Sequence, residues 1–128
     1  MVRPGGWVFA AAIPRLVRLA ALSLAEDFPR PVPAGWVSLF ERGDAPDWGR
    51  FPGGHFHTAA ELAEELRLAG LLDVEVVAIE GPDGLALEQL PEVDEELHQA
   101  ALRTVRALGH LPGFADLSNH MMGIGRVE

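Results

Sequence analysis

Residues 7–13 have the sequence WVFAAAI, which is apolar at every position. A β-strand that is covered on both faces has this pattern, because neither face meets water. The turn-forming Pro4-Gly5-Gly6 precedes the run, and Pro14, which cannot donate a ladder hydrogen bond, follows it. The stretch therefore predicts a buried strand whose apolar edge is of the kind that pairs with another strand.

Helical and strand patterns alternate along the rest of the chain. Thr58 and Glu61 have the spacing of a capping box, which predicts a helix that ends near Gly70. The other expected elements are a helix over 15–25, a strand over 74–79, a helix over 94–108 and a strand over 117–127. This order favours an α/β fold with a parallel sheet. Three strands are too few to complete such a sheet, so the pattern predicts a partial one.

The middle of the chain is rich in proline, glycine and aromatic residues and lacks periodicity. A loop this long usually serves a function, so residues 28–57 are expected to form a loop-rich lid. The lid either shields the sheet or covers a pocket, and the sequence leaves both open. We therefore expect a single partial domain over 1–128, in which a strand and helix (1–27) and a helix-strand-helix-strand unit (58–128) flank the lid.

Composition excludes several classes of protein. The 128 residues carry 10 basic and 19 acidic side chains, a net charge of −9, with no basic stripe, so nucleic acid is not expected as a partner. The chain has no cysteine, which excludes a thiolate nucleophile and suits a reducing cytoplasm. The apolar run over 7–13 is far shorter than the roughly 20 residues of a membrane span and stands at the lower limit for a signal peptide. We expect a cytoplasmic protein with no membrane partner.

Several passages of the chain resemble one known family. Residues 2–12 (VRPGGWVFAAA) resemble the entry into the fifth strand of class I S-adenosylmethionine-dependent methyltransferases. Residues 57–62 (HTAAEL) and 69–76 (AGLLDVEV) resemble the next helix and the sixth strand of that family. Residues 118–126 (SNHMMGIGR) are similar to the seventh strand that ends many bacterial members. The passages stand in the family's order and span nearly the whole chain.

The resemblance implies a partial Rossmann-like α/β sheet with equivalents of strands 5, 6 and 7, flanking helices and an antiparallel last strand. The family binds S-adenosylmethionine on the first half of its sheet, through a glycine-rich turn and an acidic residue. That half is expected to be missing here, through truncation or a start site placed too late. The chain's G-x-G, at residues 123–125, has no helix after it and does not replace that turn. The resemblance thus implies the C-terminal portion of a methyltransferase for a small-molecule acceptor, which by itself binds no cofactor and is inactive.

Relatives of this kind often cover the acceptor with the segment that corresponds to residues 15–57. The candidate substrate-binding residues in it are Trp36, Phe40, His55 and His57. His57 is also a candidate base for the acceptor, because an imidazole exchanges protons near neutral pH. No other catalytic residue is assigned.

A metal site is a further reading of the histidines. His55 and His57 lie two residues apart and, with Asp44, Asp47 or His120, could supply ligands. The spacing is common by chance, so structural or solvent-facing histidines are favoured and no metal is expected. The serines, which lack the sequence context of a nucleophile, are Ser23, Ser38 and Ser118.

Two non-enzymatic functions stay open beside the methyltransferase. The first is an α/β module that dimerises through the edge of residues 7–13, which would complete a sheet across two chains. The second is a protein that binds a small apolar ligand beneath the aromatic lid without chemistry.

Overall fold

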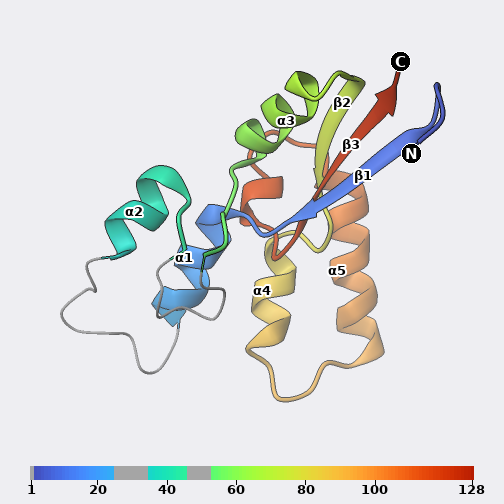
Figure 1. Ribbon diagram of the computed structural model, residues 1–128. Helices are drawn as coiled ribbons and strands as arrows, with labels where there is room; N and C mark the ends of the chain where they lie inside the picture. The colour runs from blue at the N-terminus through green and yellow to red at the C-terminus, as the bar shows by residue number, and fades with distance from the viewer. Residues whose placement is uncertain (1, 25–34, 46–52) are drawn as a thin grey trace.

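The computed structural model describes residues 2–24, 35–45 and 53–128 (Figure 1). In these residues the protein has a mixed α/β fold with a three-stranded antiparallel sheet and five α-helices. The elements in chain order are β1 (Trp7–Ala12), α1 (Arg15–Leu24), α2 (Gly35–Arg42), α3 (Ala59–Leu68), β2 (Leu71–Ala78), α4 (Pro82–Glu88), α5 (Glu95–Leu108), the short 3-10 helix η1 (Ala115–Leu117) and β3 (Met121–Val127). The α/β class predicted from the sequence is confirmed. No helix among the described residues has the length and apolar character to cross a membrane.

The strand order is β1-β3-β2, and β3 is antiparallel to both neighbours. Met121 stands opposite Ala12 on one side and Ala78 on the other. The predicted parallel sheet is therefore wrong for neighbouring strands, while the expected antiparallel last strand is confirmed. β1 and β2 do point the same way, but β3 returns between them and takes their hydrogen bonds. As a result the N- and C-terminal ends of the described chain lie side by side (Figure 1), joined by a 2.9 Å bond from the Gly5 N–H to the Val127 carbonyl.

α3 covers one face of the sheet and forms the core with it. Leu62 and Leu66 of α3 pack on Met121, which is fully buried, and on Ala115 of η1. Partly buried residues of β1 and β2 surround this cluster: Ala10, Ala12, Leu71, Val74 and Val76. The predicted capping box begins the helix, since the Thr58 side chain accepts from the Glu61 N–H and the Glu61 carboxylate accepts from the Thr58 N–H.

The two glycines of the G-x-G passage lie in β3 beneath α3. A Cβ on Gly123 would lie 2.5 Å from Leu66 Cδ1, and one on Gly125 would lie 2.9 Å from Leu71 Cβ. These glycines thus let the apolar side chains approach the strand closely.

The opposite face of the sheet is open, which corrects the prediction that β1 is buried on both faces. Trp7 is 53% exposed and Phe9 is 64% exposed, while Val8 between them is partly covered. The strand predicted over 74–79 is likewise not buried on both faces, since Glu75 is exposed and Ile79 is 39% exposed. The physical reason is that α3 covers only the face that carries Ala10, Ala12 and Met121.

β2 begins at Leu71, three residues before the predicted start. The register shifts between Leu72 and Glu75, and Asp73 in this bulge has a φ of 53°. The Asp73 carboxylate accepts a 3.0 Å bond from Arg126 Nε of β3, so the bulge is tied to the sheet. The bulge breaks the alternation of side chains between the two faces. The apolar pattern of the sequence therefore predicts only the part of the strand that follows the bulge.

Two helices occupy segments that were predicted as loops. α2 lies within the expected lid, where Trp36 and Leu39 provide its buried side. α4 begins at Pro82, which is favourable in a first helical turn, and lies between the strand predicted over 74–79 and the helix predicted over 94–108. The last strand begins at Met121 instead of residue 117, because η1 and a buried Ser118 precede it.

α5 matches the predicted helix closely and is capped by Asp94, whose carboxylate accepts a 2.8 Å bond from the Leu97 N–H. None of its residues is buried, however. Ala101 and Val105 on its apolar side line a cavity of about 360 Å³, which α4 lines from the other helix.

Candidate functional site

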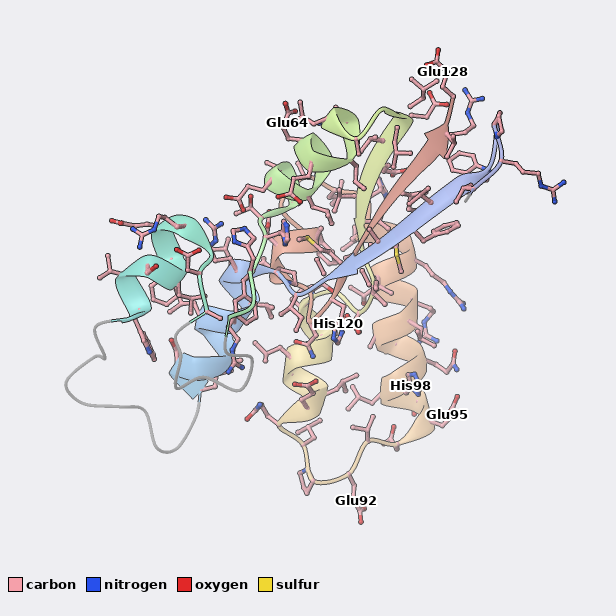
Figure 2. All side chains as sticks on the ribbon, in the orientation of Figure 1. Glu64, Glu92, Glu95, His98, His120 and Glu128 are labelled. Carbon is pink, nitrogen blue, oxygen red and sulfur yellow. The ribbon has the colours of Figure 1, made fainter. Side chains whose placement is uncertain are left out.

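A cavity of about 370 Å³ opens at the carboxyl end of β1. Small-molecule sites in proteins range from roughly 300 to 1,000 Å³. The lining residues are Ala11, Ala12, Ile13, Gly54, His55, Phe56, His57 and His120. Figure 2 shows His120 at this end of the sheet, directly before β3. Three imidazoles from two distant parts of the chain thus meet around apolar walls.

Residues 54–57, here called the histidine segment, are held in place by their backbone. The Phe56 N–H donates a 2.8 Å bond to the Gly43 carbonyl, and the Arg15 N–H donates a 2.8 Å bond to the His57 carbonyl. Gly43 has a φ of +80°, and a Cβ there would collide with the Phe56 carbonyl and the Arg15 side chain. The start of α1 and the end of α2 therefore fix the histidine segment from both sides.

The two imidazoles of the histidine segment pack edge to face, with ring centroids 4.5 Å apart. His57 Nε2 lies 3.1 Å from Glu65 Oε2 of α3. A carboxylate only accepts, so Nε2 carries the proton of the neutral ring. His57 Nδ1 is buried without a partner among the described residues, which leaves this ring poorly placed to exchange a proton with a ligand.

His55 faces an exposed polar cluster. Its Nδ1 lies 4.0 Å from Asp44 Oδ1. Hydrogen bonds from Ser38 and then Arg42, at 2.9 and 3.1 Å, lower the pKa of the Asp44 carboxyl below its ordinary value. Asp44 is therefore a stable negative charge beside the imidazole at neutral pH.

Arg15 is a buried cation that joins four segments. Its guanidinium donates to both carboxylate oxygens of Glu61, at 2.7 and 2.6 Å, and to the Phe56 carbonyl at 3.1 Å. Longer bonds of 3.4 Å reach the carbonyls of Phe40 and Glu41 at the end of α2. Arg15 thus ties α1, α2, the histidine segment and the first turn of α3 together.

The contacts with Arg15 and Thr58 change the pKa of the Glu61 carboxyl. Burial raises its pKa, but the hydrogen bonds from Thr58 and Arg15, together with the Arg15 charge, lower it by more, so the pKa lies below its ordinary value. Glu61 therefore stays ionised at neutral pH and holds the guanidinium from one side.

His120 belongs to a second network, at the ends of β2 and β3. Its Nδ1 lies 2.7 Å from Glu80 Oε1, and its backbone N–H donates a 2.8 Å bond to Glu80 Oε2. The fully buried Ser118 hydroxyl donates to Glu80 Oε2 at 3.1 Å and accepts from the N–H groups of Glu80 and Gly81 at 3.0 and 2.9 Å. Ser118 therefore orients the carboxylate and has no free proton or surface for nucleophilic attack.

The predicted substrate-binding residues divide into two groups. His55 and His57 line the cavity. Trp36 and Phe40 do not line it: Trp36 is 3% exposed, and the two rings pack edge to face in α2 with centroids 5.7 Å apart. Asp47, a candidate metal ligand, lies outside the described residues.

The arrangement does not suit a metal ion. Within residues 2–24, 35–45 and 53–128, no three histidine or acidic side chains converge in a geometry that could hold one. The carboxylates beside His57 and His120 occupy one ring nitrogen each and belong to separate networks.

S-adenosylmethionine also has no evident cradle in the part of the chain that the structure describes. Glycine-rich turns bind such cofactors because the backbone can approach them. The space beside Gly123 and Gly125 is instead filled by the side chains of Leu62, Leu66 and Leu71.

Comparison with known proteins gives no relative: no protein-family model, curated protein or solved structure matches the chain.

Sequence reasoning missed the roles of Arg15, Glu80 and Ser118, and it considered His120 only as a metal ligand. Glu80 and His120 each stand next to a strand end, and polar residues at that position commonly face a ligand site. Arg15 carried no such signal, because its partners lie more than 24 residues away along the chain.

Proposed function

We propose that this chain is the acceptor-side, C-terminal portion of an S-adenosylmethionine-dependent methyltransferase that acts on a small molecule. In this proposal β1, β2 and β3 are the fifth, sixth and seventh strands of a Rossmann-like sheet. By itself the chain is inactive, because methyl transfer requires donor and acceptor to be held in line and the described residues offer no donor site.

One observation carries the proposal: the cavity opens at the carboxyl end of β1, a strand whose outer edge and one face are uncovered. Open α/β sheets bind ligands in the crevice outside the carboxyl ends of their strands. No other strand among the described residues pairs with the free edge of β1, and Trp7 and Phe9 are largely exposed. A preceding strand on that edge would extend the sheet and bring a donor site to the cavity.

The nucleotide sequence upstream of Met1 tests the proposal. We expect an in-frame extension of roughly 120–150 residues, the missing half of a typical domain, encoding a strand followed by an acidic-x-Gly-x-Gly turn. The extended protein should transfer methyl groups, whereas the 128-residue chain should not. An upstream region without such a reading frame would contradict the proposal.

The same open edge favours a second candidate, a non-enzymatic module that dimerises through residues 7–13. Two copies of β1 could pair across a two-fold axis and cover each other's apolar residues. Size-exclusion chromatography with light scattering separates the candidates. A dimer that persists on dilution supports the module, and a compact monomer contradicts it.

A further inference from the structure

Two of the histidines that line the cavity, His57 and His120, each pair with a carboxylate that lies outside the lining, and the two pairs differ in the ring nitrogen that they engage. In His57, Nε2 faces Glu65 and Nδ1 is buried. In His120, Nδ1 faces Glu80 at 2.7 Å, and Nε2 has no partner among the described residues. His120 is also the more accessible ring, because about half of its side chain is exposed.

The Glu80 contact fixes the protonation pattern of His120. An ionised carboxylate can only accept a hydrogen bond, so the neutral His120 ring carries its proton on Nδ1. The lone pair is then on Nε2, on the other side of the ring from Glu80. Histidines that serve as bases are oriented by a carboxylate in this way.

The Glu80 carboxylate is itself held rigidly. Oε2 accepts from the His120 N–H and from the buried Ser118 hydroxyl, and Ser118 is fixed by two backbone N–H groups. Rotation of the carboxylate would break these bonds. The position of the His120 ring is therefore set by the fold before any ligand arrives.

The surroundings of His120 define the kind of ligand. His120 lines this cavity together with Ile13, His55 and His57, and it also lines a smaller cavity with Arg18 and Glu88. Among the described residues, the lining of the first cavity is mainly apolar and includes no carboxylate or guanidinium. It suits a neutral, largely apolar molecule with one polar group directed at Nε2.

We propose that His120 Nε2 is the proton acceptor for a hydroxyl-bearing, largely apolar small molecule of the phenol type, and that Glu80 is its positioning residue. In the transfer the O–H bond breaks, the proton moves to Nε2, and the electron pair stays on the oxygen. The imidazolium that forms is stabilised by the Glu80 carboxylate, to which Nδ1–H still donates. This assignment rests on the proposed function, since it makes the methyl acceptor a hydroxyl oxygen.

Nitrogen NMR of the full chain labelled at its histidines tests the geometry. Under mildly alkaline conditions, in which imidazoles are neutral, we expect His120 to show the Nδ1–H form, although free histidine prefers Nε2–H. Glu80→Gln should shift His120 toward the Nε2–H form. Glu88→Gln, which changes a carboxylate that lines the smaller cavity beside His120, should leave it unchanged. An Nε2–H ring in the unmodified protein would overturn the proposal.

Binding of phenol and anisole tests the ligand class. The two probes differ in that anisole lacks the hydroxyl proton, so phenol alone can donate to Nε2. We expect phenol to bind roughly two- to tenfold tighter than anisole, the value of one hydrogen bond. His120→Ala should abolish this ratio, whereas His110→Ala, at an exposed histidine elsewhere, should keep it. Thermal unfolding would confirm that each variant is folded.

The outcomes separate this proposal from the proposed function. Equal binding of the two probes, no binding of phenol, or a ratio that survives His120→Ala would overturn the role of His120. None of these results depends on a methyl donor, so the upstream reading frame could still establish a methyltransferase. Conversely, a phenol preference that depends on His120 would stand even if no such frame exists.

Discussion

The two faces of the sheet share the same strands but have different environments. On the α3 side, Met121 is 0% exposed and packs on leucines, and Gly123 of β3 lets the helix approach. On the other side, Trp7 and Phe9 are more than half exposed. Burying a large aromatic side chain stabilises a protein by roughly 2–3 kcal/mol, and Trp7 and Phe9 contribute little of this stabilisation while they are exposed. The described residues therefore cover one face of β1 with α3 and leave the large apolar side chains of its other face exposed.

The largest expected effect on the free energy of unfolding comes from truncating a side chain on the face that α3 covers. Met121→Ala should lower the free energy of unfolding by about 3 kcal/mol, because it removes a fully buried side chain and leaves a cavity. Met122→Ala changes the adjacent residue, which points to the opposite face and is only partly buried, and should cost roughly 1 kcal/mol. Denaturant unfolding measures both. Equal losses would contradict the asymmetry of the two faces.

Arg15→Ala should have the next largest effect, because Arg15 holds the start of α3 on the covered side. The variant loses the paired bonds to Glu61 and leaves the Phe56 carbonyl without its donor. Since Glu61 is 41% exposed, water compensates it in part, and we expect a loss of about 2–3 kcal/mol.

A matched control for Arg15 is Arg42→Ala, which removes an exposed ion pair with Asp44. That variant should cost less than about 1 kcal/mol in urea unfolding. If Arg42→Ala destabilised the protein as much as Arg15→Ala, the buried network would not have the structural role given to it here.

Acid should weaken the same contact. The pKa of Glu61 lies below its ordinary value of about 4.3 in the folded chain, so its contribution to stability is present above that pH. The contribution is lost as the pH falls through the folded pKa. The free energy of unfolding of Glu61→Gln, followed by urea titrations from about pH 6 to 3, should fall less steeply than that of the unmodified protein. Parallel curves would contradict the assignment.

The smallest expected effect lies on the open face. Phe9→Thr replaces an exposed aromatic residue by one that retains a high β-propensity, so the free energy of unfolding should change by roughly 0.5 kcal/mol or less. The variant should also associate less at high concentration, as light scattering would show. A loss as large as that of Met121→Ala would mean that this face is covered.

The local elements of the fold could be predicted where short-range chemistry decides them. The Thr58–Glu61 capping box, the Asp94 cap and the apolar run of β1 each mark an element within a few residues. The Asp73 bulge and the return of β3 between β1 and β2 could not, because register and strand order are set by long-range packing. The sequence also did not predict the exposure of β1, because a strand composed of apolar residues has the same sequence pattern whether its faces are covered or exposed.

The candidate site was half predictable for a similar reason. His55 and His57 were found because they lie only two residues apart in the sequence, and the structure places both on the cavity. His120 joins them from the far end of the chain, and its partner Glu80 lies 40 residues before it. Which ring nitrogen is free depends on that contact alone, so no sequence pattern distinguishes the two histidine-carboxylate pairs.

The most direct test of the central claim is calorimetric titration with S-adenosylmethionine of two proteins, the 128-residue chain and the version extended by its upstream reading frame. We predict no heat of binding for the shorter protein and stoichiometric binding for the extended one. Tight binding by the 128 residues alone, or none by the extended protein, would contradict the assignment of this chain as the acceptor side of a divided methyltransferase fold.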